Sequence, residues 1–570
     1  MDDAVKIMVV GDSISHGRQG DWTWRYRLWQ WLGREGVAAT FVGPYRGTVP
    51  PDDPEPPRPP PLASDPPRPG FFRTDGGYAE GVSPRFLANS HHFAVSGRQA
   101  MQAKELIAEQ IATYQPDVCL VELGFNDMAW FVSGPHDTLA SMEQLVRQAR
   151  SAKPDLQFAI ANVPHRTFLP GREDLPANTN EYNALLARAI PAWSTPESPI
   201  ALVRFCENYG GGGEHVADAT YDGIHPNALG EFQLAQAFTR TLIADFRIGR
   251  RELSIPTSVP RRPTPTPARV KASPAPSGVV VTWDAVYGAF WYDVRIRLAG
   301  SESWTVVPVS CNRYDTTFCV SGQRWEYQVR TCGGNTVKSS WSEVVSAVAD
   351  PQTLPAPSRI RTHATADGFN VTWEPFPEGL DVDRYGVLAF DEDYPGAFPY
   401  VVGIKGSGGR VSGLVPGHRY GVAVQTWSTA GGGLPGGARA VTVCRGTPLP
   451  PVRLQLTVLD RTTAELEWMG DPAAAGYRVW VRRTGTGVEI RSEVADSTNA
   501  STSSLSTKAL LRDLYPSVWE FEFSVSAYNG NDESDVSQWV VAPRPVESSH
   551  TIDLAEVHAL HISLAYSPPP

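Results

Sequence analysis

A serine stands where an apolar run ends near the start of this chain. Residues 5–17 read VKIMVVGDSISHG, and the β-branched apolar residues have the composition of a buried parallel strand. Ser13 therefore lies at the carboxyl end of the expected strand, where open α/β sheets bind their ligands. Because a serine hydroxyl attacks a carbonyl only when a base removes its proton, Ser13 is a candidate nucleophile that needs a histidine.

His225 is the candidate base among the twelve histidines. It lies in YDGIHPN at residues 221–227, and Asp222 precedes it by three positions. This carboxylate can fix the tautomer of the imidazole and stabilise the imidazolium formed during attack. Two structural alternatives stay open, a surface turn for Asp222 and His225 and a helix cap for Ser13. We expect other histidines near strand ends to be structural or to line the pocket, namely His16, His91, His92 and His165.

Two further stretches offer hydrogen-bond donors for an oxyanion. Residues 92–97, HFAVSG, end at Gly97, whose missing side chain lets a substrate oxygen approach the backbone N–H. Residues 118–127, VCLVELGFND, contain a second apolar strand followed by Asn126, whose amide can also donate. The alternative for Asn126 is a bond to its own loop. For Asp127 and Asp12 we favour a structural role.

The order of these blocks resembles the SGNH (GDSL) hydrolase superfamily over about the first 250 residues. The matching blocks are Gly11-Asp12-Ser13, Gly97, Gly124-x-Asn126-Asp127 and Asp222-x-x-His225. The resemblance implies a triad of Ser13, His225 and Asp222. It also implies an oxyanion hole made by the backbone N–H groups of Ser13 and Gly97 and by the Asn126 side chain, with no cofactor and no metal. The GxSxG elbow of the α/β-hydrolase fold is absent, because Ile14 and Ser15 follow the serine.

Strands and helices alternate through this region. We expect strands at residues 39–42, 118–123, 156–162 and 200–205, and helices at residues 24–35, 100–114, 138–152, 179–190 and 228–246. Such alternation predicts a three-layer α/β domain with a parallel sheet covered on both faces, and the resemblance implies the flavodoxin-like SGNH arrangement.

Other residues near this edge are candidates for substrate contact or core packing. The aromatic candidates for substrate binding are Trp22, Trp24, Trp130 and Phe131. Residues 47–70 are dense in proline, so they form neither a helix nor a central strand. We interpret them as a mobile insert, either a surface loop, which we favour, or a lid.

The composition changes after about residue 250. The sequence predicts a catalytic domain over residues 1–250, a Pro/Thr/Arg linker over 251–266, three modules of short alternating strands over 267–350, 354–445 and 449–545, and a tail over 546–570 without assignment. Each module has an early tryptophan and a late aromatic residue, and resembles a fibronectin type III β-sandwich. The third departs from that family because Phe521 lacks the hydroxyl of the tyrosine corner.

The role of the modules stays open between spacers and a binding array for carbohydrate or protein. We expect residues 1–250 alone to retain activity on small esters. The net charge of −11, without a Lys/Arg run, argues against a nucleic acid partner, and the sequence predicts no membrane span. Six cysteines form no metal-binding pattern, and one disulfide among Cys311, Cys319 and Cys332 is conceivable. Without a leader in the sequence, localisation stays open between the cytoplasm, as written, and secretion, if the leader is missing.

Together these features predict a serine ester hydrolase with an acyl-enzyme intermediate. The resemblance extends to carbohydrate esterases that remove short acyl groups, especially acetyl, from plant polysaccharides, so the expected substrate is a small ester or an acylated polysaccharide. One alternative is a general short-chain esterase, or a lipase if the insert is an apolar lid. An alternative of another class is a surface-binding or adhesive protein whose function lies in the β-sandwich array.

Overall fold

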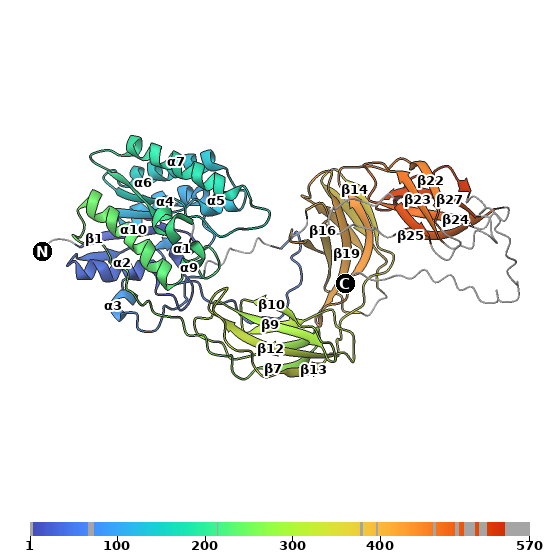
Figure 1. The fold of residues 1–570 in the computed structure, drawn as a ribbon, viewed down its shortest axis with the longest axis horizontal. Coiled ribbons are helices and arrows are strands. Elements are labelled where there is room, and N and C mark those ends of the chain that lie inside the picture. The colour runs from blue at the N-terminus through green and yellow to red at the C-terminus, as the bar shows by residue number, and fades with distance from the viewer. Residues whose placement is uncertain are drawn as a thin grey trace.

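The chain folds into an α/β domain followed by three β-sandwich modules (Figure 1). The computed structural model describes residues 4–65, 73–213, 215–376, 380–394, 397–459, 463–484, 489–494, 508–511 and 521–541. The predicted tail at 546–570 lies outside these residues. Among the described helices, none has the length and apolar character that a membrane crossing needs.

A parallel sheet forms the centre of the first domain. Its strands are β1 (Val5–Gly11), β2 (Ala39–Phe41), β3 (Phe93–Ala94), β4 (Val118–Glu122), β5 (Gln157–Ala161) and β6 (Ile200–Val203). The order is β2-β1-β4-β5-β6, and β3 pairs with the carboxyl end of β1. This is the flavodoxin-like order, with a topological switch at β1. The predicted fold class is confirmed, and the switch lies where Ser13 leaves the sheet.

Helices cover both faces of the sheet. The long helices are α2 (Thr23–Arg34), α4 (Ala100–Tyr114), α6 (Pro135–Ala152), α7 (Leu175–Trp193) and α10 (Ala228–Phe246). The short ones are α1 (Ser13–His16), α3 (Pro84–Leu87), α5 (Phe125–Ala129), α8 (Phe205–Asn208), α9 (Val216–Ala219) and the 3-10 helix η1 (Gly210–Gly213). Helices α2 and α10 pack together on one face, while α4, α6 and α7 form the other layer (Figure 1).

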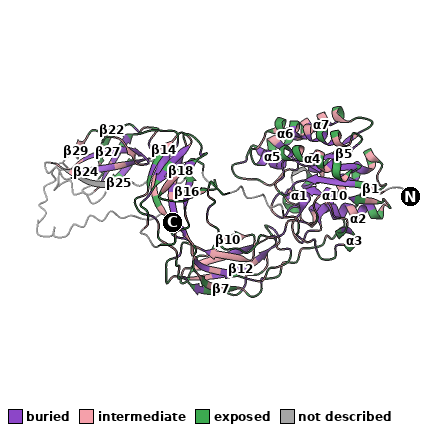
Figure 2. Ribbon diagram, turned by 180° about the vertical axis from the view of Figure 1, so that it is seen from behind, coloured by how far each residue is buried: buried purple, intermediate pink, exposed green. Residues whose placement is uncertain are grey.

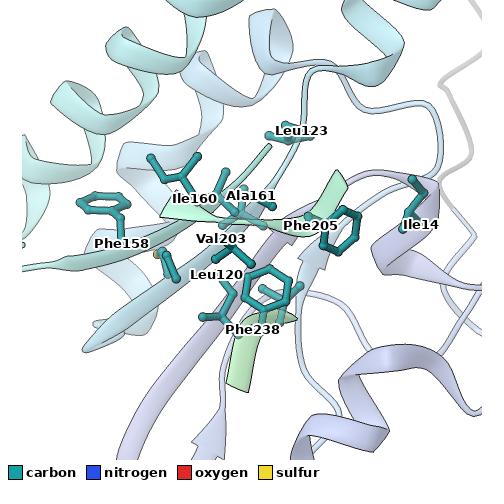
Figure 3. Packing of buried hydrophobic residues seen from close by; sticks show 14 of the residues in the cluster. Ile14, Leu120, Leu123, Phe158, Ile160, Ala161, Val203, Phe205 and Phe238 are labelled. Carbon is teal, nitrogen blue, oxygen red and sulfur yellow. The ribbon is translucent and has the colours of Figure 1, made fainter. Parts of the chain in front are cut away.

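The core lies between these layers. Side chains of β4 and β6 such as Leu120 and Val203 are fully buried and lie beside Phe238 of α10, whereas Phe158 of β5 is buried on the opposite face of the sheet (Figure 3). Burial along β4 is continuous rather than alternating, as expected for a strand covered on both faces. The neighbouring β1 is likewise coloured mostly as buried in Figure 2. The sheet is therefore a rigid platform for the loops at its carboxyl edge.

Some predicted boundaries differ from the structure. The strand expected before Gly97 is only the two-residue β3, because the chain turns away from β1 after Ala94. The strand expected at residues 200–205 ends at Val203, and Phe205 already belongs to the short helix α8. All six cysteines are free thiols, so the conceivable disulfide in the first module is not formed.

Each later module contains antiparallel sheets. The first contains β7 (Lys271–Ala275), β8 (Gly278–Thr282), β9 (Trp291–Leu298), β10 (Thr305–Val309), β11 (Arg313–Thr316), β12 (Arg324–Cys332) and β13 (Val345–Val348). The second contains β14 (Arg361–Thr365), β15 (Gly368–Thr372), β16 (Arg384–Asp391), β17 (Tyr400–Ile404), β18 (Gly408–Ser412), β19 (Arg419–Ser428), β20 (Gly431–Gly432) and β21 (Gly436–Thr442). The third contains β22 (Val452–Val458), β23 (Ala464–Met469), β24 (Gly476–Arg483), β25 (Glu489–Val494), β26 (Lys508–Leu511), β27 (Phe521–Asn529), β28 (Asp532–Glu533) and β29 (Val540–Val541).

The repeated aromatic residues have the packing roles that a sandwich needs. The early tryptophans are buried in the three cores, namely Trp283, Trp373 and Trp468. In the second module the Tyr420 hydroxyl accepts a hydrogen bond from the N–H of Val415 at 3.1 Å, which is a tyrosine corner. In the first module Tyr327 instead bonds the Thr316 hydroxyl at 2.8 Å.

The proline-rich insert contacts the second module. Residues 47–65 are described, and Leu62 forms a parallel bridge with Gly403 of β17. The N–H of Gly403 donates to the Pro61 carbonyl at 2.7 Å, and Arg384 pairs with Asp65 at 3.3 Å. Since β17 is an edge strand, the insert covers backbone groups that would otherwise be unpaired. Residues 61–65 of the insert are therefore paired with the second module rather than free in solvent.

Candidate active site

Ser13, His225 and Asp222 form a continuous hydrogen-bonded chain. The Nε2 atom of His225 lies 2.8 Å from the Ser13 Oγ, although the two residues are 212 positions apart. The Nδ1 atom of the same ring lies 2.7 Å from Asp222 Oδ2. The three residues that the sequence singles out are thus brought together at the carboxyl edge of the sheet.

The loop that carries His225 is closed by its own hydrogen bonds. Asp222 Oδ1 accepts the N–H groups of His225 at 2.9 Å and Ile224 at 3.1 Å. The N–H of Tyr221 donates to the His225 carbonyl at 2.9 Å. Asn227 then caps α10 by accepting the N–H of Leu229 at 2.9 Å. The cap connects the loop directly to a long buried helix.

The electrostatics of this loop favour an ionised Asp222. Burial alone would raise the pKa of Asp222, but the hydrogen bond and charge of the His225 ring and two backbone N–H groups together lower it below its ordinary value. An ionised Asp222 accepts the proton on Nδ1 of His225. The lone pair of Nε2 therefore faces the Ser13 hydroxyl, as a general base requires.

Two buried carboxyl groups, those of Asp12 and Glu122, form hydrogen bonds that fix the nucleophile loop. Asp12 accepts the N–H of Ile14 at 2.9 Å, and its other oxygen accepts the Asn126 amide at 3.1 Å. Glu122 accepts the Ser15 hydroxyl at 2.8 Å. Burial raises the pKa of Asp12 to about 6, and burial together with the Asp12 charge raises the pKa of Glu122 well above its ordinary value. Asp12 therefore has the loop-holding role that its position predicts.

The three groups that the sequence predicts as oxyanion donors lie on loops that follow β1, β3 and β4. Ser13 is the first residue of α1, where a backbone N–H has no partner inside the helix. Gly97 has φ +80°, a conformation that favours glycine. The Nδ2 of Asn126 bonds both Asp12 and the Arg98 carbonyl, each at 3.1 Å. A substrate oxygen would therefore have to share one of the Asn126 protons with a present acceptor.

Several polar residues near the site have structural roles. Asp127 accepts the N–H groups of Ala100 at 2.8 Å and Met101 at 3.1 Å, and so caps α4. His16 is buried, and desolvation followed by the charges of Arg25 and Arg98 lowers its pKa to about 3. His92 is fully buried, and desolvation is again the largest cause that lowers its pKa well below the ordinary value.

An aromatic platform lies beside the nucleophile loop. A Cβ on Gly97 would come within 3.0 Å of the Trp130 ring, yet 59% of Trp130 is exposed. Phe131 is 68% exposed and has φ +55°. The buried Arg172 holds this turn, since its guanidinium lies 3.8 Å from the Phe131 ring centroid and donates to the Met128 carbonyl at 2.9 Å. No feature of the sequence points to Arg172. Glu122 could have been found from the sequence, because it is a charged residue within an apolar run.

The predicted substrate contacts of the other two tryptophans have different outcomes. Trp24 is fully buried and stacks on Phe238 with 4.6 Å between ring centroids. Of the two alternatives for Trp24, its burial supports core packing over substrate contact, because α2 turns this indole into the core. Trp22 is half-buried and lines a cleft of about 630 Å³ between the first domain, the linker and the first module.

The profile of the GDSL-like lipase/acylhydrolase family matches residues 63–231. The chain contains a GDSL-like acylhydrolase domain. The matched stretch includes Gly97, Asn126, Asp222 and His225, and it begins after Ser13. Such a domain is that of a carboxylic ester hydrolase. Within the described residues, no group of three or more His, Cys, Asp or Glu side chains is arranged to hold a metal ion.

Other comparisons cover parts of the chain. The structure of a carbohydrate esterase family 3 from Talaromyces cellulolyticus is 21% identical and covers 42% of this chain and 96% of that one, with a TM-score of 0.31. A Clostridium thermocellum family 3 carbohydrate esterase is 20% identical and covers 43% of this chain and 98% of that one, with a TM-score of 0.31. The chicken CNTN1 FN1–FN3 domains are 15% identical and cover 50% of this chain and all of that one, with a TM-score of 0.18.

Human usherin is also similar over part of its length. The two sequences are 30% identical over 159 residues, which is 24% of this chain. The chain spans 3% of the length of usherin.

Proposed function

We propose that this protein is a serine ester hydrolase that works through an acyl-enzyme intermediate. The observation that carries the proposal is the hydrogen-bonded chain from Asp222 through His225 to the Ser13 hydroxyl. A hydroxyl aligned on the free nitrogen of an oriented imidazole is the arrangement that makes serine nucleophilic. Neither the surface turn nor the helix cap accounts for this alignment.

In the first half-reaction the Ser13 Oγ attacks the ester carbonyl while His225 Nε2 accepts its proton. Ionised Asp222 stabilises the imidazolium that forms. His225 then gives the proton to the leaving alcohol, and the acyl group stays on Ser13. Water attacks the acyl-enzyme with His225 again as base, which releases the acid and restores the serine.

The tetrahedral intermediate carries a negative oxygen that needs fixed donors. We assign this role to the backbone N–H groups of Ser13 and Gly97 and to the Asn126 amide. Each donor of this kind contributes about two to three orders of magnitude in rate when it is already oriented. The bond to Asp12 holds the Asn126 amide near the nucleophile before substrate arrives.

For the substrate we propose a short acyl group, such as acetyl, on a carbohydrate. The exposed faces of Trp130 and Phe131 support this assignment, because the flat apolar faces of a sugar ring gain free energy when they cover exposed indole and phenyl surface. The closeness of the Trp130 ring to Gly97 supports this assignment, because we assign the Gly97 N–H to the oxyanion. Arg172 keeps the platform in place without substrate.

A lipase with an apolar lid is the alternative within the same enzyme class. The described part of the proline-rich insert pairs with β17, so it gives no support to a lid. Binding of carbohydrate or protein by the modules is an additional candidate role.

Hydrolysis of a p-nitrophenyl ester series from acetate to palmitate, together with acetylated xylan, tests the proposal. We expect the wild type to cleave acetate fastest and to release acetate from xylan, and Ser13→Ala to be inactive on all of them. Activity that rises with chain length would support the lipase alternative. Equal inactivity of wild type and variant would contradict the esterase proposal.

A further inference from the structure

The loop that carries His225 is packed against the first β-sandwich module. Tyr221, directly before Asp222, stacks on Phe290 with 3.6 Å between ring centroids and 18° between ring planes. On the catalytic side Tyr221 stacks on His225, with 5.5 Å between centroids and 16° between planes. Both Tyr221 and Phe290 are buried. The rings of His225, Tyr221 and Phe290 thus stack one on the next and are nearly parallel. The first two belong to the α/β domain, and Phe290 belongs to the first β-sandwich module.

The backbone of the module also reaches this loop. The N–H of Asn335 donates to the Tyr221 carbonyl at 2.7 Å. Gly334 comes so close that a Cβ there would lie 3.0 Å from the same carbonyl oxygen. Tyr221 is therefore held by a ring contact on one side and by a hydrogen bond to its main chain.

The nucleophile side has a contact of its own. Arg262, in the linker, pairs with the buried Asp21 and donates to the Gln19 carbonyl at 3.0 Å. These residues follow the helix of Ser13, and Asp21 itself accepts the N–H of Arg18 at 2.6 Å. The same guanidinium donates to the Gly288 carbonyl and lies 3.8 Å from the centroid of Phe290.

Phe290 is the common point of these contacts. It touches the base loop through Tyr221 and the nucleophile side through Arg262. Its own N–H donates to the Cys332 carbonyl at 3.0 Å, so β12 of the module fixes its position. A module that served only as a spacer would need a linker and no contact with either catalytic loop.

We propose that the first β-sandwich module is part of the catalytic unit, with Phe290 and Arg262 as positioning residues that hold His225 in line with Ser13. This inference rests on the esterase function proposed above. The His225 side chain is 26% exposed, so the ring stack adds a fixed contact on the ring itself to the hydrogen bonds that close the loop. The contacts lead us to expect that residues 1–250 alone lose activity, which is the opposite of the expectation from the sequence.

The test uses full-length variants and a fast small ester, p-nitrophenyl acetate. Phe290→Ala removes the ring contact, and we expect kcat to fall about 10-fold with KM nearly unchanged, because the base is misaligned while the ester site is intact. The rate of Ser13 labelling by a serine-directed phosphonate should fall by the same factor. The matched control is Trp325→Ala, seven residues away along β12 and so about 23 Å from the contact. It also removes a large ring from the same module, and should leave kcat unchanged.

A second variant keeps the module core intact. Arg262→Gln releases the nucleophile side, and we expect kcat to fall about 5-fold, with Arg262→Lys recovering part of the loss because it retains the charge beside Asp21. If Phe290→Ala does not fold, this pair of variants decides the question. The proposal is overturned if kcat and the labelling rate of folded Phe290→Ala, or of Arg262→Gln in its place, equal those of wild type. Failure of wild type to hydrolyse esters or to label Ser13 would instead contradict the esterase function.

Discussion

The two loops of the proposed triad are held in different ways. The Ser13 helix is held from inside its own domain by Arg25, a buried residue of α2, while the residues that follow the helix contact Arg262 of the linker. The Arg25 guanidinium donates to the carbonyls of Ser15 at 2.8 Å and His16 at 3.0 Å, and also to those of Gly47 and Ser90. The base loop, residues 221–227, lies nearer the surface, and its Tyr221 ring stacks on Phe290 of the first module.

Because of this difference, we expect variants of one loop to change mainly the stability of the first domain and variants of the other to change mainly kcat. Loss of a buried guanidinium leaves several carbonyls without a partner, so the free energy of unfolding of the first domain should suffer. Loss of a contact under the base loop leaves that domain folded and changes only how the imidazole is aligned. Variants of the two loops can therefore be told apart by measuring stability and kcat side by side.

The largest effect should come from the base loop. Asp222→Asn removes the charge that orients His225, and we expect kcat to fall about 10⁴-fold on p-nitrophenyl acetate because the imidazole adopts the wrong tautomer. The control is Asp218→Asn, an exposed aspartate of the neighbouring α9 with the same change of charge. It should leave kcat unchanged, and a loss below 10-fold for Asp222→Asn would contradict the triad.

The next largest effect should be on stability. Arg25→Met takes the guanidinium donor away from the carbonyls of Ser15, His16 and Ser90, while the Gly47 carbonyl keeps other partners. We expect the free energy of unfolding to fall by about 3 kcal/mol. Urea unfolding followed by tryptophan fluorescence measures it. Arg34→Met, at the exposed end of the same helix, should change stability by less than about 0.5 kcal/mol. Equal effects of the two variants would remove the distinction between the loops.

Asn126→Ala tests a side chain to which we assign two roles, as a donor to the oxyanion and as a structural link between Asp12 and the Arg98 carbonyl. Loss of the amide should lower kcat by about 10²- to 10³-fold, with little change in KM, because the donor acts on charge present only in the transition state. It should also lower the thermal midpoint, since the amide ties Asp12 to the Arg98 carbonyl. A change in the midpoint without a change in kcat would make Asn126 a purely structural residue.

The smallest effect should be a pH dependence of stability from His16. Its pKa is about 3 in the folded chain and near 6.5 when unfolded, so between these values only the unfolded chain takes up the proton. Stability from this residue is complete above pH 6.5 and is lost as the pH falls, by about 1.4 kcal/mol per pH unit. His16→Asn, which keeps an acceptor for the Ser96 N–H, should reduce that slope by about this amount in urea titrations from pH 4 to 6. If the slope of stability against pH is the same in His16→Asn and wild type, His16 must take up its proton equally in the folded and unfolded chains, which would contradict the lowered pKa.

Much of the site could be predicted because it follows from strand ends. Ser13, Gly97 and Asn126 each follow an apolar strand, and parallel strands bring their carboxyl ends to one edge. His225 and Asp222 are three residues apart, so one loop supplies both. The alternation of strands and helices likewise predicts the α/β fold and its layers.

Contacts between distant segments could not be predicted in the same way. Tyr221 and Phe290 belong to different modules, and no local pattern states that their rings meet. The pairing of Leu62 with Gly403 joins a proline-rich insert to an edge strand more than three hundred residues later. Trp24 was a fair candidate from its position, but the rotation of α2 about its axis, set by packing against α10, turns it inward.

The most direct test of the central claim is to identify the residue that a serine-directed phosphonate modifies in the full-length protein. The account predicts one adduct, on the peptide that contains Ser13, formed much more slowly in His225→Ala than in wild type. Adduct formation on another serine, or equal rates of Ser13 labelling in wild type and folded His225→Ala, would contradict it.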